Sequence, residues 1–169
     1  PWIVATEALA PFRTTAYKRQ QGDPKPLPYL SSPDNEKAGG LDIMLEVAVT
    51  TAAMRKKGLA PHVLGKPVFR EMYWTVFQMV AHHTSNGCNL NPGDLMGSGT
   101  ISGSNDDQLG SLMELTRGGG REIGLPGGET RTYLEDGDEI VMRAWCQRDG
   151  FARIGFGACR STIAPTRAG

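Results

Sequence analysis

The 169-residue sequence has few cysteines, no excess of either charge and no long apolar run. Its three cysteines, Cys88, Cys146 and Cys159, show no CxxC spacing, which argues against a zinc site and against a secreted disulfide framework. Eighteen basic and eighteen acidic residues cancel, so no overall field attracts nucleic acid or an anionic membrane. Because no apolar run approaches the roughly 18 residues that span a bilayer, we expect a soluble, cytoplasmic protein with a small-molecule or protein partner.

Turn-forming residues are abundant. The 22 glycines and 11 prolines separate short apolar runs, a pattern typical of a β-rich fold with many turns. In the clearest run, Leu41, Ile43, Leu45, Val47 and Val49 alternate with less apolar residues, as in a half-buried strand. Arg148-Asp149-Gly150 predicts a hairpin turn. We expect strands over residues 41–49, 95–102, 111–117, 130–134, 139–147 and 152–158.

One segment has a helical period instead. Its apolar positions recur three and four residues apart, and Asn86-Gly87 supplies residue types that end a helix. The spacing therefore predicts a single packed helix over about 69–86, with loops over 31–40 and 54–67. The predicted fold class is mainly β (α+β), mixed and mostly antiparallel, with one domain over residues 1–169.

Several blocks carry a resemblance to a known family. They are Asp23-Pro24-Lys25-Pro26-Leu27-Pro28-Tyr29-Leu30, Met72-Tyr73-Trp74-Thr75, the run from His82 to Ser104, Gly110-Ser111-Leu112-Met113-Glu114-Leu115, Gly128 to Leu134, Asp136-Gly137-Asp138-Glu139 and Gly155 to Cys159. In this order they resemble the C-terminal part of the catalytic domain of fumarylacetoacetases, in the fumarylacetoacetate hydrolase family. The likeness runs from about Trp2 to Arg160, without a clear match at 31–40 and 54–67.

The resemblance implies a β-sandwich or roll of the fumarylacetoacetase type. It also implies hydrolysis of the carbon–carbon bond of 4-fumarylacetoacetate to fumarate and acetoacetate, the last step of phenylalanine and tyrosine catabolism. Such a protein is expected to be a homodimer with bound Ca²⁺ or Mg²⁺. The chain begins Pro1-Trp2, without an initiator Met, and reads like a cut through a larger protein. We therefore expect the catalytic histidine and the metal ligands in the upstream half of the polypeptide, and an inactive 169-residue chain on its own.

Three residues of this chain are implied in the site. Glu114 matches the glutamate that orients the catalytic histidine, and Gly99 and Thr100 match a substrate-binding loop. From the residues alone, Glu114 reads as a solvent-facing strand carboxylate and Thr100 as a strand threonine beside glycines. No metal ligand is expected here, although Asp42 and Glu46 share a strand face. His82 and His83 match a structural pair, with His83 expected in the core.

Two other interpretations stay open. Acylpyruvases and oxaloacetate decarboxylase-like members of the wider superfamily tend to have proline after the threonine, as GTPxG, whereas this chain has Gly99-Thr100-Ile101-Ser102-Gly103. The third interpretation is a non-catalytic β module left by truncation. Catalytic activity of the protein that contains this chain would exclude the non-catalytic module. The choice of substrate would then distinguish a fumarylacetoacetase from an acylpyruvase or an oxaloacetate decarboxylase-like enzyme.

Overall fold

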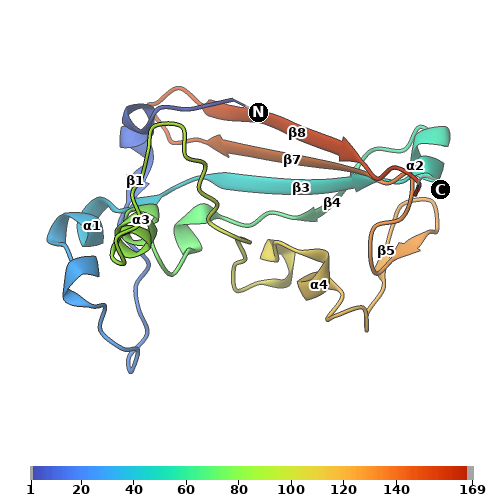
Figure 1. Cartoon of the computed structure of the whole chain (residues 1–169). Helices are drawn as coiled ribbons and strands as arrows, with labels where there is room; N and C mark the ends of the chain where they lie inside the picture. The colour runs from blue at the N-terminus through green and yellow to red at the C-terminus, as the bar shows by residue number, and fades with distance from the viewer. Residues whose placement is uncertain (1, 167–169) are drawn as a thin grey trace.

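A four-stranded antiparallel sheet organises the chain, in the order β4-β3-β7-β8 (Figure 1). The computed structural model describes residues 2–166. The strands are β3 (Met44–Thr50), β4 (His62–Gly65), β7 (Glu139–Cys146) and β8 (Ile154–Thr162). Short antiparallel pairs lie toward its two ends, β1 (Arg13–Thr14) with β2 (Gly40–Leu41) and β5 (Ile123–Gly124) with β6 (Thr130–Arg131). The predicted mainly β, mostly antiparallel class is confirmed.

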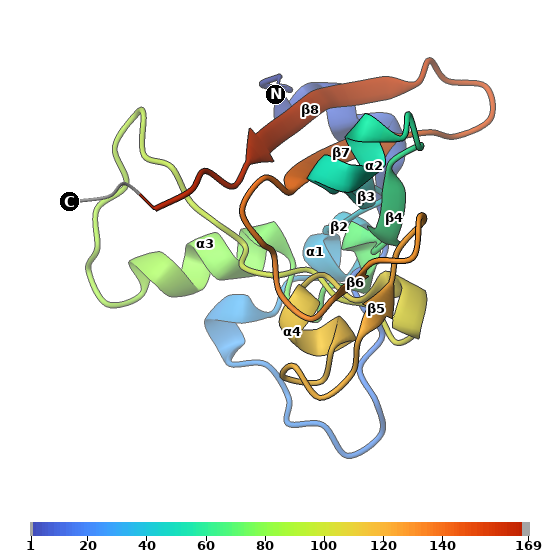
Figure 2. The same cartoon turned by 90° about the vertical axis from the view of Figure 1, so that its right-hand side faces the viewer.

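Helices flank the sheet without forming a continuous layer (Figure 2). The α-helices are α1 (Pro33–Ala38), α2 (Ala52–Lys56), α3 (Val76–Thr84) and α4 (Leu112–Leu115). The 3₁₀ turns are η1 (Thr6–Phe12), η2 (Pro28–Leu30), η3 (Phe69–Glu71) and η4 (Asp106–Gln108). Helices α1 and α3 lie near β1, α2 lies at the opposite end of the sheet, and α4 lies between them in the view of Figure 1.

The centre of the sheet is the pairing of β3 with β7. Their register runs without interruption from Met44 opposite Trp145 to Thr50 opposite Glu139. The predicted strand over 139–147 is confirmed, as is the hairpin to the last strand, because β7 and β8 pair on either side of the Arg148-Asp149-Gly150 turn. The predicted strand over 41–49 is divided between β2 and β3, with Asp42 and Ile43 outside both elements.

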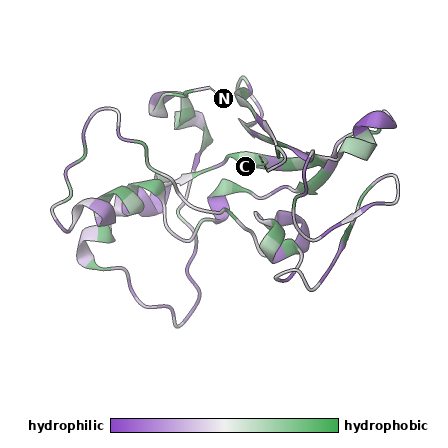
Figure 3. Ribbon diagram, turned by 45° about the vertical axis from the view of Figure 1, so that its right-hand side comes forward, coloured by the Kyte–Doolittle hydropathy of each residue, from purple (hydrophilic) through white to green (hydrophobic). Residues whose placement is uncertain are grey.

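Two separate hydrophobic clusters hold the ends of the sheet. One gathers Leu9, Phe12, Leu41, Ile43 and Cys146; the other gathers Val49, Met54 and Leu125. In Figure 3 hydrophobic stretches follow the strands of the sheet, whereas much of the chain in the loops is pale or hydrophilic. Burial raises the pKa of the Cys146 thiol, with a smaller contribution from the charge of Asp42. The cluster that contains Cys146 therefore holds a neutral thiol.

The helix predicted over 69–86 is shorter than expected. Residues Phe69–Glu71 form a 3₁₀ turn, and α3 begins only after Thr75. Thr75 sets this start because its Oγ1 accepts from the Gln78 amide at 3.2 Å while Gln78 Oε1 accepts from the Thr75 amide at 3.0 Å. This reciprocal cap satisfies two amides that a helix start would leave open.

Two predicted strands and two predicted loops are wrong. Residues 95–102 have no regular secondary structure, and 111–117 contain the helix α4. The supposed loop over 31–40 contains α1, and that over 54–67 contains the end of α2 and all of β4. The strand predicted over 130–134 is only the two residues of β6. A side-chain cap explains both helices: Ser32 Oγ accepts from the Asn35 amide, and Thr51 Oγ1 accepts from the Met54 amide.

Candidate functional site

Glu114 lies in the short helix α4, and a serine begins that helix. Ser111 is the N-cap, and its Oγ accepts from the Glu114 amide at 3.3 Å. The same hydroxyl donates to Glu114 Oε2 at 2.8 Å. Ser111 therefore fixes both the backbone and the carboxylate of Glu114, and the turn places this carboxylate at the surface.

A second serine reaches the same oxygen from a distant loop. Ser102 Oγ donates to Glu114 Oε2 at 2.9 Å and accepts from the Gly110 amide at 3.1 Å. The Ser111 hydroxyl is the largest cause of a lowered pKa for the Glu114 carboxyl, partial burial opposes the shift, and the Ser102 hydroxyl lowers the pKa further. The amides of Ser111 and Gly110 act in the same direction. Glu114 is consequently held as the carboxylate.

Gly110 lets the loop that carries Thr100 reach α4. A Cβ atom at Gly110 would lie 2.1 Å from the Ile101 carbonyl oxygen and 2.9 Å from Thr100 Cγ2. No side chain fits there without moving the loop backbone. The structure therefore brings the Thr100 segment and the Glu114 segment together, one of them irregular and the other helical.

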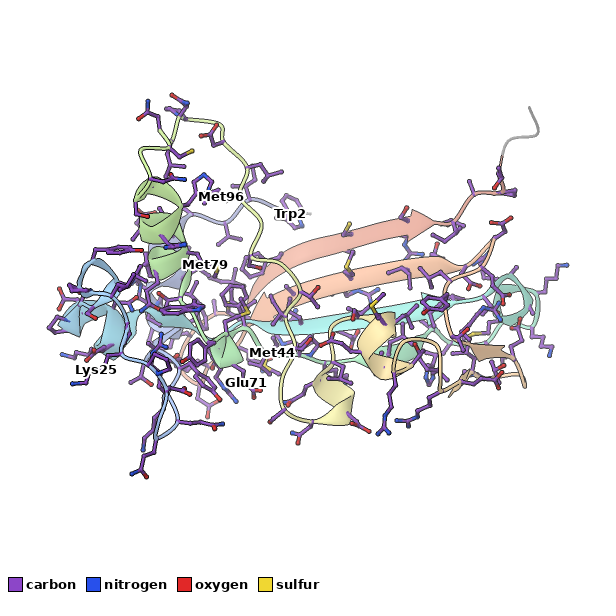
Figure 4. All side chains as sticks on the ribbon, turned by 60° about the horizontal axis from the view of Figure 1, so that its bottom comes forward. Trp2, Lys25, Met44, Glu71, Met79 and Met96 are labelled. Carbon is purple, nitrogen blue, oxygen red and sulfur yellow. The ribbon has the colours of Figure 1, made fainter. Side chains whose placement is uncertain are left out.

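Thr100 and Gly99 are themselves exposed. Gly99 has φ of +78°, a left-handed conformation that favours glycine, and open space surrounds the position of its missing Cβ. Nearby, Glu71, which is labelled in Figure 4, approaches Gly103: a Cβ at Gly103 would lie 2.5 Å from Glu71 Oε2. Packing of the loop at Gly103 and Gly110 leaves Gly99 and Thr100 free to face a ligand.

A hollow of about 190 Å³ borders Glu114. Its charged lining includes Arg117, Arg121 and Asp106, and Arg121 Nη1 lies 3.4 Å from Asp106 Oδ2. Arg117 has φ of +52°, a left-handed conformation that is uncommon for a residue with a side chain. The hollow beside Glu114 is therefore lined by arginine side chains and by a second carboxylate, that of Asp106.

Chemically, the arrangement makes Glu114 a fixed, ionised acceptor. Both serines use Oε2, while Oε1 accepts no hydrogen bond within residues 2–166. A carboxylate with one oxygen held and the other open can accept from an imidazole N–H and fix its tautomer. Ser102 and Gly110 were not among the site residues expected from the sequence. Ser111 had a usable signal, because S-x-x-E is the pattern of a helix start.

The other acidic and histidine residues singled out in the sequence have ordinary partners. Asp42 pairs with Arg70 at 2.8 Å, and Glu46 lies 3.6 Å from Lys66 and 3.7 Å from Arg143. Across the described part of the chain, no three His, Cys, Asp or Glu side chains gather as metal ligands. Asp42 and Glu46 are held by these basic side chains, whereas a Ca²⁺ or Mg²⁺ ion binds about six oxygens.

The two histidines lie on the exposed side of α3. Tyr29 OH and His82 Nδ1 are 2.8 Å apart with nearly parallel rings, and His83 Nε2 lies 3.3 Å from Cys88 Sγ. The prediction that His83 belongs to the core is wrong, because its side chain is exposed. The reason is that α3 packs mainly against η2 and buries only Gln78.

No helix among residues 2–166 has the length and apolar character needed to cross a membrane.

Comparison with known proteins gives the class of protein. The family model described as "Fumarylacetoacetate (FAA) hydrolase C-terminal" matches residues 1–164, and the chain belongs to this family. Within this family, the chain is similar to fumarylacetoacetases. The chain is 43% identical to fumarylacetoacetases of Oryza sativa subsp. japonica and Rattus norvegicus, and 42% identical to that of Homo sapiens, each over 98% of this chain. It spans 36–37% of the length of these relatives.

Proposed function

We propose that the protein containing this chain hydrolyses the carbon–carbon bond of 4-fumarylacetoacetate, giving fumarate and acetoacetate. The observation that carries the proposal is the fixed, ionised carboxylate of Glu114, with its free Oε1, beside the Thr100 loop. The similarity of the whole matched segment to fumarylacetoacetases supports this choice of substrate. Glu114 is proposed as the residue that orients a catalytic histidine located outside this chain.

In the proposed reaction the histidine removes a proton from water, and the water oxygen bonds to a carbonyl carbon of the substrate. The adjacent carbon–carbon bond breaks, its electron pair leaves with the acetoacetate part as an enolate, and a proton is then added at that carbon. Ionised Glu114 stabilises the imidazolium formed in the first step. The Thr100 hydroxyl and the open backbone at Gly99 are proposed to bind a substrate oxygen.

The remaining features of the proposal rest on family resemblance. We propose a homodimeric, cytoplasmic enzyme that requires Ca²⁺ or Mg²⁺, with the ion held by carboxylates in the upstream half of the same polypeptide. The 169-residue chain alone is then expected to be inactive, since it supplies only Glu114, Gly99 and Thr100. An acylpyruvase-like reaction is less well supported, because Ile101 stands where that pattern has proline.

The test is turnover of fumarylacetoacetate by the protein that contains this chain, followed through loss of diketone absorbance with added Ca²⁺ or Mg²⁺. Glu114→Gln should lower kcat by about 10²–10⁴. If Glu114 acts through an imidazole, the acid limb of kcat/KM should also move to lower pH, because a neutral amide no longer stabilises imidazolium. Glu7→Gln, at an exposed glutamate in η1, is the matched control and should retain activity.

Two results would contradict the proposal. Full activity of Glu114→Gln would remove Glu114 from the mechanism. Turnover of acylpyruvate or oxaloacetate in preference to fumarylacetoacetate would assign the protein to another branch of the superfamily. Metal-dependent turnover by the isolated chain would leave the reaction in place, but it would contradict the claims that the catalytic histidine and the metal ligands lie elsewhere and that the chain alone is inactive.

A further inference from the structure

A second cavity, of about 470 Å³, lies between residues 19–30 and the beginning of α3. Its walls are mostly apolar and include Leu27, Leu30, Trp74 and Met79. Lys25 and Met79 on its lining are labelled in Figure 4. None of Gly99, Thr100 and Glu114 lines this cavity, and its volume is within the about 300–1,000 Å³ of small-molecule sites. The cavity therefore lies away from the three residues of this chain that are proposed in the catalytic site.

A guanidinium stands at this cavity in a fixed position. The Arg19 guanidinium carbon lies 4.2 Å from the ring centre of Tyr73 and 4.1 Å from that of Trp74. Tyr73 is held in turn, because its hydroxyl donates to Asp23 Oδ2 at 3.0 Å. Contact with two aromatic faces orients a guanidinium while leaving its N–H groups available to another partner.

The positive charge at the cavity is not neutralised by an ion pair. Within residues 2–166 neither Arg19 nor Lys25 pairs with a carboxylate. Among residues 2–166, no Asp or Glu and no serine or threonine lines the cavity. Of its other titratable lining residues, Tyr73 donates a hydrogen bond to Asp23 and His82 is hydrogen-bonded to Tyr29. The cavity therefore offers a planar guanidinium, one nearby ammonium and a large apolar wall.

We propose that this cavity binds a small arylalkanoate, that is, a carboxylate attached through a short chain to an aromatic ring. The carboxylate accepts two parallel N–H bonds from Arg19, the geometry that a guanidinium favours, and Lys25 adds charge at the rim. The ring packs against Leu27, Trp74 and Met79. A phosphate ester fits less well, because the hydroxyl of Tyr73 already donates to Asp23 and the lining has no serine or threonine hydroxyl among residues 2–166 for a dianion.

The test is calorimetric titration of the protein containing this chain with 2-naphthylacetate, with neutral 2-naphthylacetamide as the matched ligand. The acid should bind, and the amide should bind at least about tenfold more weakly, a difference of 1.4 kcal/mol. Arg19→Gln should reduce affinity for the acid about tenfold and leave that for the amide unchanged. Lys18→Gln removes the same charge from an exposed neighbour outside this cavity and should leave both affinities unchanged.

Several outcomes would overturn the proposal. Equal affinity for acid and amide would remove the role of Arg19, even if Arg19→Gln failed to fold. Loss of acid binding in Thr100→Val, with Arg19→Gln unaffected, would place the ligand at the proposed catalytic site instead. Absence of binding by either compound would show that the cavity is closed to small molecules, for example by a carboxylate from elsewhere in the polypeptide. The result expected from the proposal is instead that Thr100→Val retains binding of the acid.

Discussion

The carboxylates of Asp138 and Glu114 both accept hydrogen bonds from side chains, but they differ in exposure and in the charge of their partners. Asp138 has a side chain only 1% exposed and accepts from Arg131 Nε at 2.8 Å and from Arg131 Nη2 at 3.1 Å. Glu114 is exposed and accepts from two neutral serine hydroxyls at a single oxygen. One carboxylate has its charge neutralised inside the protein, whereas the other keeps its charge at the surface.

The reasons for their pKa values differ in the same way. Burial opposes ionisation of Asp138, but hydrogen bonds from Arg131 and the Glu135 amide, with the charges of Arg131 and Arg55, outweigh burial and lower its pKa. At Glu114 the hydroxyl of Ser111 is the largest cause and no cation contributes. A carboxylate that stays ionised without a paired cation can still stabilise a positive charge that forms during a reaction. The comparison therefore indicates a structural role for Asp138 and supports the proposal that Glu114 takes part in the chemistry.

The largest effect on stability is expected from Asp138→Asn. The change leaves the charge of Arg131 buried without its bidentate partner, and breaking a buried pair costs about 3–5 kcal/mol. We expect about 3 kcal/mol, the lower end of that range, because Glu129 and Glu135 remain within 3.4 Å of the guanidinium. Urea unfolding measures the loss. Asp136→Asn, at an exposed neighbour, should change stability by under about 0.5 kcal/mol, and equal losses in both variants would contradict a structural role for the pair.

Gly110→Ala should have the next largest effect, and it should affect both stability and rate. The added methyl meets the Ile101 carbonyl oxygen, so the loop must move, at a cost of about 1–3 kcal/mol. Movement of Ile101 displaces Thr100 and removes the Ser102 contact to Glu114. Gly97→Ala is the matched control, because nothing lies within 4 Å of its added Cβ. Unaltered turnover in Gly110→Ala would show that close approach of the two segments is not required.

How far the sequence predicts these two regions depends on which interactions create them. Strand β7 and its hairpin to β8 follow from alternation and a turn signal within the same short segment. The local pattern around Glu114 is ambiguous, because Leu112, Met113 and Leu115 suit either a strand or a helix. Ser111 decides between them by capping α4, and the contact from Ser102 depends on loop packing that no local pattern contains.

The loop that carries Thr100 shows the same limit. Glycines at 97, 99 and 103 interrupt a run that otherwise reads as a strand, and the positive φ of Gly99 turns the chain out of an extended path. The roles proposed for Glu114 and Thr100 rest on family resemblance rather than on spacing. Their proximity could not be predicted, since it depends on the missing side chain of Gly110.

Thr100→Val tests whether the Thr100 loop contributes binding as well as position. Valine keeps the shape of threonine and removes the hydroxyl, so kcat/KM should fall about tenfold, the scale of one lost hydrogen bond to substrate. Steady-state turnover of fumarylacetoacetate measures the change. Thr100→Ser restores a hydroxyl and should recover most of the rate. Ser104→Ala, at an exposed residue of the same segment, should have no effect, and an equal fall in Ser104→Ala would indicate loop damage instead.

The smallest expected effects come from removing the serines one at a time, and they test why Glu114 is ionised. A lowered pKa means that the carboxylate adds stability above the ordinary glutamate pKa, and that this stability is lost as pH falls through the folded-state pKa. Ser111→Ala should raise the pKa of Glu114 more than Ser102→Ala, because the Ser111 hydroxyl makes the larger contribution. It should also cost about 1 kcal/mol through the lost cap of α4.

Carbon NMR titration of the Glu114 carboxyl measures both pKa changes directly. Ser111→Thr keeps a hydroxyl at the cap and should restore both the low pKa and the stability. The reverse order, with Ser102→Ala shifting the pKa more, would mean that the loop rather than α4 holds the charge. In that case Glu114 would depend for its ionisation on the same loop that carries Thr100, and the two groups would act as one unit in the reaction.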